Sequence, residues 1–525
     1  MNPGLLGVST HGLLNTMRTV LQRRQIAKIF VACLLVSAIP SGASAKSDNP
    51  HLDDRIWSTA LANDGTVALV GDFIGTANFG GKTLRSLGDY DGFVSMLNAD
   101  GTHRWSRRVG SLANDRLFNS AFDSTGALYV AGVTRGQMTI GNTTYGNQQR
   151  CTWGRWCEDV NVIVKFSPRG EVDWVWESPG DFEWTSSIAI DNADYLWVAQ
   201  GFWYRGEGVQ FGARFMRFDP IGRLVSGGGR RAKRNGDLIS TDQYTQGLYI
   251  TDLKVDAQGD LVATGSITCI AKFIDSGLTI TPRSRNSTLS ANNENPASSQ
   301  CYGSPFYSPS DAVVIKFAPD GELRWAANIG SASYDWPDGD TSDEWLDDVV
   351  TLPDGTILAG GGYLDRAYDF YRGIRQAKRT AIALSPNGNI LGEFRAASVS
   401  TCNSRWSDCD QSGYATVLAG TLSSVISYSS VPGSRVARMQ IAPLRDGSLA
   451  SGSANAIGVR GPLSISALPD GRFVAVSLIR YPYGETYDVV GFDRIATLKR
   501  ESGARHLVVT GRLTDTVVVG WKRRY

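Results

Sequence analysis

One phrase recurs along the sequence and constrains the fold more than any other feature. The stretch "DYDGFVSMLNADGTHRWSRRVG" begins at Asp89 and places two alternating apolar runs around an Asp-Gly turn, with a tryptophan four residues after the glycine. Versions of it return as "VNVIVKFSPRGEVDWVWESPG" from Val160, "DAVVIKFAPDGELRWAANIG" from Asp311 and "AIALSPNGNILGEF" from Ala381. Alternation with a period of two on both sides of such a turn predicts a β-hairpin.

A second hairpin pattern precedes these phrases and ends near a glycine. It reads "STALANDGTVALVG" from Ser58, "SAFDSTGALYVAG" from Ser120, "SIAIDNADYLWVAQG" from Ser187, "DLKVDAQGDLVATG" from Asp252, "DVVTLPDGTILAGG" from Asp348 and "SISALPDGRFVAVS" from Ser464. Two hairpins in series make a four-stranded antiparallel sheet, and a repeated sheet of this kind is a propeller blade. The sequence therefore predicts an all-β protein with a single β-propeller of four-stranded antiparallel blades.

Pairing the two halves predicts seven blades, with six or eight as the alternatives. Five units are clear, and the sixth is weaker. The tail "HLVVTGRLTDTVVVGWKRRY" reads as one more hairpin, which either closes the last blade or begins an eighth. The predicted blade boundaries are 54–110, 111–180, 181–229, 230–330, 331–399, 400–461 and 462–525.

The first unit resembles the bacterial β-propeller repeats known as SBBP or delta-60 repeats. The residues that carry the resemblance are "LANDGTVALVGDFIGTANFGGKTLRSLGDYDGFVSMLNADGTHRW" from Leu61, which follow that family's "FGG…L…G..D.FV.KLD.DG…W" pattern. The match is partial in the second and fourth units and faint after residue 400. The resemblance implies a propeller, and it transfers no catalytic motif.

The turn glycine and the tryptophan of the phrase have different predicted roles. Gly101 accepts the positive φ that the tight turn requires. Trp105, Trp174 and Trp325 occupy one repeated strand position. Aromatic side chains at such a position usually fill the layer between sheets, so we expect them to pack between blades rather than to bind a ligand.

The N-terminal residues have the pattern of an export signal. Basic Arg23, Arg24 and Lys28 precede the apolar run "IFVACLLVSAI", and "SGASA" ends with small residues at Ala45. The apolar run is too short to span a bilayer. We therefore expect a signal peptide over residues 1–45 and a propeller domain over 46–525, which is exported to the periplasm or secreted and has no membrane span.

The net charge of the sequence bears on its binding partners. The 52 basic and 51 acidic residues nearly cancel, which argues against nucleic-acid binding, and we expect a monomer.

Six cysteines follow the export signal, without the spacing or histidines of a zinc site. In an exported chain they predict disulfides, paired locally. The expected pairs are Cys151 with Cys157, Cys269 with Cys301, and Cys402 with Cys409.

The long connections are predicted to share one face. In an antiparallel blade the turns between strands one and two and between strands three and four point one way, and the other connections point the opposite way. In this sequence the turns between strands one and two and between strands three and four are all tight. Every long insertion lies in one of the other connections. Loops gathered on a rigid scaffold commonly bind ligands, and disulfides would lower the cost of ordering them.

Aromatic residues and arginines are frequent in these connections. Both are enriched at interaction hot spots, and aromatic faces beside charges also suit sugar rings; packing of the loops against one another is the alternative. The candidate ligand-binding residues are Trp153, Trp156, Trp203, Tyr363, Trp406, Tyr481 and Tyr483.

No catalytic motif is recognisable, because GxSxG, HExxH and phosphate-binding glycine loops are absent from the sequence. The favoured function is the binding of a glycan or protein ligand on the looped rim. The alternative is a glycan-active enzyme, a polysaccharide lyase in which a tyrosine abstracts a proton and an arginine neutralises the uronate carboxylate. The candidate catalytic residues are Tyr204, Arg205, Arg366, Tyr368, Tyr371 and Arg372.

One acidic stretch, "DWPDGDTSDEWLDD", could hold calcium, which prefers six or more oxygen ligands. Its spacing does not follow the D-x-D-x-D-G loop, so a solvated acidic loop is the favoured interpretation. The calcium candidates are Asp335, Asp338, Asp340, Asp343 and Glu344. No other cofactor is predicted.

Overall fold

The computed structural model describes most of the first five predicted units and separate strands of the last two. The chain divides into Met1–Asn49 and Pro50–Tyr525, and all described residues belong to the second part. The described ranges are 55–79, 81–145, 160–177, 183–206, 208–225, 239–240, 248–267, 271–272, 279–280, 311–329, 343–365, 375–402, 417–420, 424–430, 437–445, 448–449, 455–457, 463–468, 472–479, 485–490, 494–499, 505–512 and 518–523. Across these ranges every regular element is a β-strand. They include no helix that is long and apolar enough to cross a membrane.

The first two sheets are joined by a strand exchange. The first has the order β1-β2-β3-β4-β7-β8, and the second has the order β5-β6-β9-β10. Hairpin β7–β8 comes from the connection between β6 and β9, yet it pairs with the outer strand of the first sheet. The strands are β1 (Arg55–Leu61), β2 (Val67–Ala77), β3 (Leu84–Leu97), β4 (His103–Gly110), β5 (Arg116–Phe122), β6 (Leu128–Thr134), β7 (Met138–Ile140), β8 (Thr143–Tyr145), β9 (Val160–Phe166) and β10 (Val172–Glu177).

The next three sheets each follow chain order. They are β11-β12-β13-β14, with β15 also pairing with β13, then β16-β17-β20-β21 and β22-β23-β24-β25; β18 and β19 form a separate pair. The strands are β11 (Glu183–Ile190), β12 (Leu196–Gly206), β13 (Gly208–Phe218), β14 (Leu224–Val225), β15 (Ile239–Ser240), β16 (Leu248–Val255), β17 (Leu261–Ile267), β18 (Ala271–Lys272), β19 (Thr279–Ile280), β20 (Asp311–Phe317), β21 (Leu323–Ile329), β22 (Asp343–Thr351), β23 (Ile357–Asp365), β24 (Arg375–Leu384) and β25 (Ile390–Cys402).

The last two sheets depart from simple chain order. The sixth is β26-β27-β28-β29, with β30 on β28, and the seventh is β31-β32-β35-β34, while β33 pairs with β36. The strands are β26 (Val417–Gly420), β27 (Ser424–Ser430), β28 (Ala437–Arg445), β29 (Ser448–Leu449), β30 (Asn455–Ile457), β31 (Leu463–Ala467), β32 (Arg472–Ile479), β33 (Glu485–Val490), β34 (Arg494–Lys499), β35 (Arg505–Arg512) and β36 (Val518–Arg523).

The tail thus differs from the expected hairpin. Strand β35 pairs with β32 and β34, whereas β36 pairs with β33. A strand paired on both sides favours β-branched residues, and β35 carries Val508 and Val509. Alternation of apolar residues identifies both strands of the tail but says nothing about their partners.

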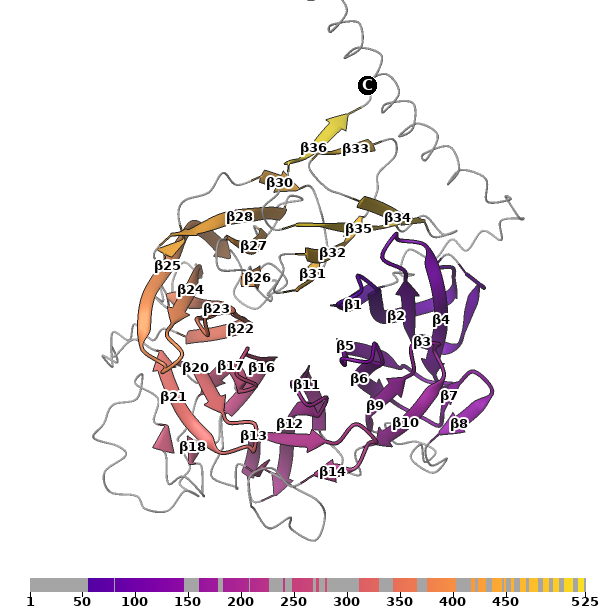
Figure 1. Cartoon of the computed structure of the whole chain (residues 1–525), viewed down its shortest axis with the longest axis horizontal. Helices are drawn as coiled ribbons and strands as arrows, with labels where there is room; N and C mark the ends of the chain where they lie inside the picture. Colours follow the sequence, from indigo (N-terminus) through magenta and orange to yellow (C-terminus); the bar gives the residue numbers. More distant parts are fainter. Residues whose placement is uncertain are drawn as a thin grey trace, which may run out of the picture. The chain divides into compact units, whose positions relative to one another are not determined.

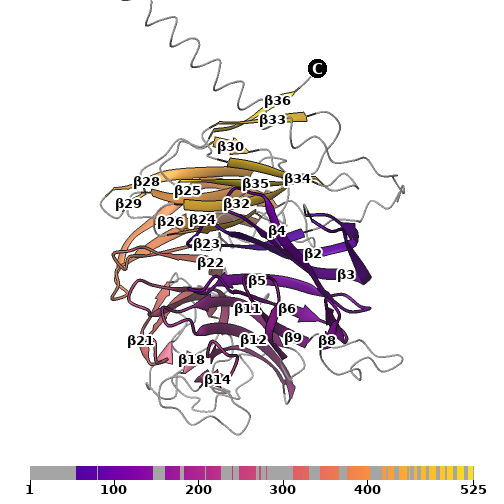
Figure 2. The same ribbon diagram turned by 45° about the vertical axis from the view of Figure 1, so that its right-hand side comes forward.

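The described sheets confirm the all-β class and the four-stranded antiparallel unit. The first strands contact one another in succession, β1 with β5, then β11, β16, β22, β26 and β31, and β31 contacts β1. In Figure 1 the later strands of the first five sheets lie farther from the centre than the first strand of each sheet. Figure 2 shows the same sheets turned by 45°. Apolar clusters fill the space between neighbouring sheets, as where Val94 and Met96 of the first meet Val130 and Val164 of the second.

A β-bulge near the start of the first strand explains the recurring glycine. The pairing register skips one residue in β1, β5, β11, β16, β22 and β26. Opposite four of these bulges lies a glycine, and a Cβ there would approach a backbone oxygen to 2.0 Å or less. Only glycine permits such an approach. These glycines are Gly71, Gly132, Gly265 and Gly361.

The recurring tryptophans pack between neighbouring sheets, as predicted. Trp105 donates from Nε1 to the carbonyl of Pro168, in the β9–β10 turn of the next sheet, over 3.1 Å. Gly170 in that turn has a φ of 78°, and a Cβ there would lie 2.6 Å from the indole. The arrangement recurs for Trp174 with Pro220 and Gly222, and for Trp325 with Pro386 and Gly388.

Candidate binding site

Most residues proposed from the sequence for the site lie outside the described residues. Each expected disulfide also includes at least one cysteine outside the described residues. They are Trp153, Trp156, Arg366, Tyr368, Tyr371, Arg372, Trp406, Tyr481 and Tyr483, with Asp335, Asp338, Asp340, Cys151, Cys157, Cys269, Cys301 and Cys409.

The remaining candidates lie on strands. Residues Trp203 to Arg205 continue β12, opposite Val209 to Phe211 of β13, although the sequence suggested a loop there. Aromatic residues favour strands, which explains why this hairpin extends so far. On the fifth sheet, Tyr363 of β23 lies opposite Glu344 of β22. Asp343 begins β22, and Cys402 ends β25.

Of the calcium candidates, Asp343 and Glu344 lie on β22, and the other three lie outside the described residues. Over the described ranges, no three residues among histidine, cysteine, aspartate and glutamate come together as a metal site would require.

A different set of arginine and aromatic side chains comes together where β1 and β5 begin. The guanidinium carbon of Arg55 lies 5.6 Å from the ring centroid of Tyr90 on β3, and that of Arg116 lies 5.9 Å from the same ring. Arg55 also lies 5.7 Å from the Trp57 ring, whose edge meets Phe118 at 6.0 Å. These five residues, with Asp72 of β2, are called the arginine–aromatic cluster.

The bulges of the first strands account for this convergence. Trp57 and Phe118 are the residues that the pairing register skips in β1 and β5. They therefore leave the regular alternation of their strands and meet between the two sheets. The neighbouring Arg55 pairs with Asp72 across the β1–β2 ladder.

The carboxylate of Asp72 lies behind the arginines. Its side chain is fully buried, its Oδ2 accepts a hydrogen bond from Trp57 Nε1 over 2.6 Å, and Arg116 Nε lies 3.9 Å from the same oxygen. Burial raises the pKa of Asp72, against the opposing effects of the Trp57 hydrogen bond and the charges of Arg55 and Arg116. Within the described structure, Asp72 Oδ1 has no hydrogen-bond partner, which is unusual for a buried oxygen.

Two hydrogen bonds of its main chain hold Tyr90 against the connection between β4 and β5. Its amide donates to Asn114 Oδ1 over 3.2 Å, and its carbonyl accepts from the amide of Asp115 over 2.7 Å. Since Asp115 directly precedes Arg116, the tyrosine and the second arginine are positioned by one connection.

The cluster remains accessible to solvent. The Arg116 side chain is 40% exposed, and Arg55, Trp57, Tyr90 and Phe118 are half-buried. It lies at the strand ends away from the tight Asp-Gly turns, which is the side where the long connections are expected. Guanidinium groups pair with carboxylate or sulfate groups, and aromatic faces pack on apolar faces of sugars. The arrangement can therefore hold an anionic ring.

The residues of this cluster are absent from the candidates proposed from the sequence, because they lie inside the repeated strands. One signal could have revealed it. The bulge position is aromatic in the first two units, at Trp57 and Phe118, but holds Ser186, Thr251 and Asp347 in the next three. A large half-exposed aromatic residue at a position that is otherwise small or polar indicates a local function.

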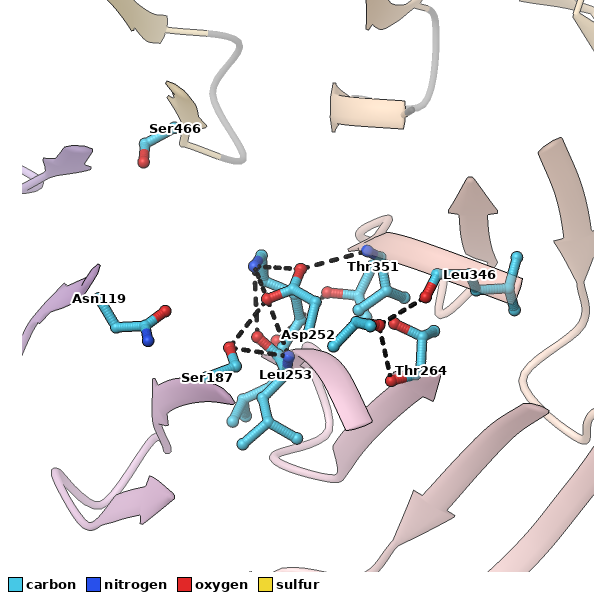
Figure 3. A network of polar contacts seen from close by, with 12 residues as sticks. Asn119, Ser187, Asp252, Leu253, Thr264, Leu346, Thr351 and Ser466 are labelled. Carbon is cyan, nitrogen blue, oxygen red and sulfur yellow. Dashed lines mark hydrogen bonds and ion pairs between the residues drawn. The ribbon is translucent and has the colours of Figure 1, made fainter. Parts of the chain in front are cut away.

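A second polar network joins the first strands of the third, fourth and fifth sheets (Figure 3). Asp252 of β16 accepts hydrogen bonds from the Ser187 hydroxyl at 2.9 Å, the Leu253 amide at 2.8 Å and the Val349 amide at 3.2 Å. Lys254 lies 2.7 Å from its Oδ2. Both carboxylate oxygens are occupied by neighbouring strands, so this network holds sheets together.

Comparison with known proteins assigns no family. No family model matches the chain, and no curated protein matches it. Solved structures that it resembles include hydrazine synthase of Kuenenia stuttgartiensis, at 14% identity over 83% of this chain and 96% of that one, with a TM-score of 0.40. A protein of unknown function from Dyadobacter fermentans has 8% identity over 88% and 100%, with a TM-score of 0.38.

An ulvan lyase described as a new family of polysaccharide lyase has 10% identity over 79% of this chain and 81% of that one, with a TM-score of 0.35. At these identities and TM-scores the similarities carry no argument about the activity of this chain.

Proposed function

We propose that the protein binds an acidic glycan at the arginine–aromatic cluster. The observation that carries this proposal is the position of the Tyr90 ring within 6 Å of two guanidinium groups, those of Arg55 and Arg116. A uronate or sulfated sugar offers both an anion for the arginines and an apolar ring face for the aromatic side chains.

The proposed scaffold is an exported seven-bladed propeller related to the SBBP repeats. The unbroken succession of contacts from β1 to β31 and back to β1 supports seven blades. Two contacts between the last sheet and the first add to this support: Arg472 Nη2 donates to the carbonyl of Asn63 over 2.7 Å, and the hydroxyls of Thr59 and Ser466 lie 3.3 Å apart. A rigid scaffold of this kind presents its site without a large ordering cost.

The test is calorimetric titration of the exported form with uronate, sulfated and neutral polysaccharides. Arg116→Ala should weaken binding of the acidic polysaccharides about tenfold or more, since hydrogen bonds to charged groups contribute about 1.5–3 kcal/mol. Arg104→Ala is the matched control, because Arg104 is exposed near the tight β3–β4 turn. Equal affinity of Arg116→Ala and the unaltered protein would rule out this site.

A polysaccharide lyase is the second candidate, favoured by the same approach of a tyrosine to two arginines. A lyase would release unsaturated sugar ends from the uronate polysaccharide, seen as rising ultraviolet absorbance, and Tyr90→Phe would abolish that release while leaving the glycan bound. Binding without any rise in absorbance would favour the binding function.

A further inference from the structure

We propose that this site couples anion binding to proton uptake, so that it holds an acidic glycan more tightly in mild acid than at neutral pH. The inference rests on the proposed function and adds its regulation.

Three aspartates with almost no solvent exposure lie in and beside the cluster. Asp72 and Asp91 are 0% exposed and Asp115 is 1% exposed. Asp72 lies on β2, Asp91 lies on β3, and Asp115 directly precedes β5. Burial of several carboxylates within adjacent strands is costly when all are ionised.

Within the part of the chain that the structure describes, few groups face Asp91 and Asp115. Asp91 Oδ2 accepts from Arg108 of β4 over 2.8 Å and from the amide of Leu87 over 3.0 Å, whereas its Oδ1 has no hydrogen-bond partner in the described structure. Asp115 accepts from the amide and hydroxyl of Ser111 and, over 3.1 Å, from the amide of Arg135.

The charges of this region cancel when every group is ionised. Asp72 faces Arg55 and Arg116, and Asp91 faces Arg108 and the negative charge of Asp115. Three carboxylates then oppose three guanidinium groups. A bound anion would have to compete with the carboxylates already present. A proton taken up by Asp72 leaves the charges of Arg55 and Arg116 available to the ligand, whereas one taken up by Asp91 or Asp115 lowers the negative charge beside them.

Burial raises the pKa of all three aspartates, and it raises that of Asp115 to about 6. A carboxyl group with a raised pKa binds its proton more tightly in the folded protein than in water, so protonation proceeds as the pH falls through about 6 in the case of Asp115. By linkage, a ligand that prefers the protonated site must itself promote proton uptake.

The test uses dextran sulfate, whose sulfate groups stay ionised, titrated at pH 7.5 and pH 5.0 at constant ionic strength. The affinity should rise on the order of tenfold in acid, because neutralising one nearby carboxylate removes a repulsion worth about one pKa unit. Calorimetric titrations in buffers of different ionisation enthalpy should show that the protein takes up protons when dextran sulfate binds.

Asp72→Asn reproduces the neutral form of the central carboxyl group, because its side-chain oxygen can still accept from Trp57. This variant should bind more tightly than the unaltered protein at pH 7.5 and should change less with pH. Asp123→Asn is the control, since Asp123 is a buried aspartate of the β5–β6 turn that pairs with Lys165 at 3.1 Å, outside the cluster. It should retain the full pH dependence.

The two proposals fail in distinguishable ways. Dextran sulfate binding that is equal at both pH values, or that takes up no proton, overturns the coupling and leaves the glycan proposal standing. If no polysaccharide binds, the proposed function fails, and inorganic sulfate then tests the coupling through the Nε–H resonance of Arg116. That resonance should respond at lower sulfate concentration at pH 5.0 than at pH 7.5, and an equal response would overturn the coupling.

Discussion

The arginine–aromatic cluster and the Asp252 network use the same structural position in opposite ways. Both form at the bulge of a first strand, the former at β1 and β5 and the latter at β16. Both oxygens of Asp252 are occupied by Ser187, Leu253, Val349 and Lys254, whereas Asp72 keeps one buried oxygen unpartnered among the described groups. A satisfied carboxylate joins sheets, and an unsatisfied one beside exposed arginines indicates a ligand site.

The largest effect should come from filling the space opposite a bulge. Gly132→Ala would place a Cβ 2.0 Å from the Arg116 carbonyl oxygen, and Gly265→Ala would place one 1.8 Å from that of Tyr249. Because backbone atoms cannot move aside easily, each change should lower the free energy of unfolding by about 3 kcal/mol. Urea unfolding measures the loss.

Ligand binding should separate the two glycine variants. Gly132→Ala displaces Arg116 and should abolish glycan binding by the folded fraction, whereas Gly265→Ala disturbs only the Asp252 network and should leave the affinity unchanged. Comparable binding by both variants would show that the two bulges are not functionally different.

A smaller effect is expected from Asp252→Ala. The change leaves the amide of Val349 without its acceptor. The Leu253 amide keeps the Ser187 hydroxyl oxygen at 3.1 Å, and Lys254, which is 45% exposed, regains water. The free energy of unfolding should therefore fall by about 2 kcal/mol, with unchanged glycan affinity. Thermal unfolding and calorimetric titration of the same preparation check both expectations, and a loss of affinity would place the network in the site.

The smallest expected effect is the change of the free energy of unfolding with pH. Because burial raises the pKa of Asp115 to about 6, its contribution to stability is present in acid and is lost as the pH rises through that value. The free energy of unfolding should be about 1 kcal/mol higher at pH 5 than at pH 7 on this account. Asp115→Asn should flatten the difference in urea unfolding, and an unchanged slope would assign the titration elsewhere.

Local features of the fold could be predicted because they repeat within a few residues. Gly101 takes a φ of 80°, as its Asp-Gly turn requires, and Trp105 packs on the next sheet. Gly132 belongs to a glycine that recurs in the repeated sequence pattern. The requirement for glycine there comes from the close approach of the Arg116 carbonyl, which depends on the pairing of two strands and on a bulge. The partner of β35 was likewise hidden, since alternation does not specify which strand lies alongside.

The candidate site also separates what the sequence determines locally from what only the tertiary structure decides. Sequence alone determined the hairpins, the tight turns and the strand positions that must be buried, because a period of two and Asp-Gly chemistry act over neighbouring residues. The meeting of Arg55, Tyr90 and Arg116 was decided by tertiary structure. These residues belong to three strands of two sheets, and only the bulges and the contact of those sheets turn their side chains toward one another.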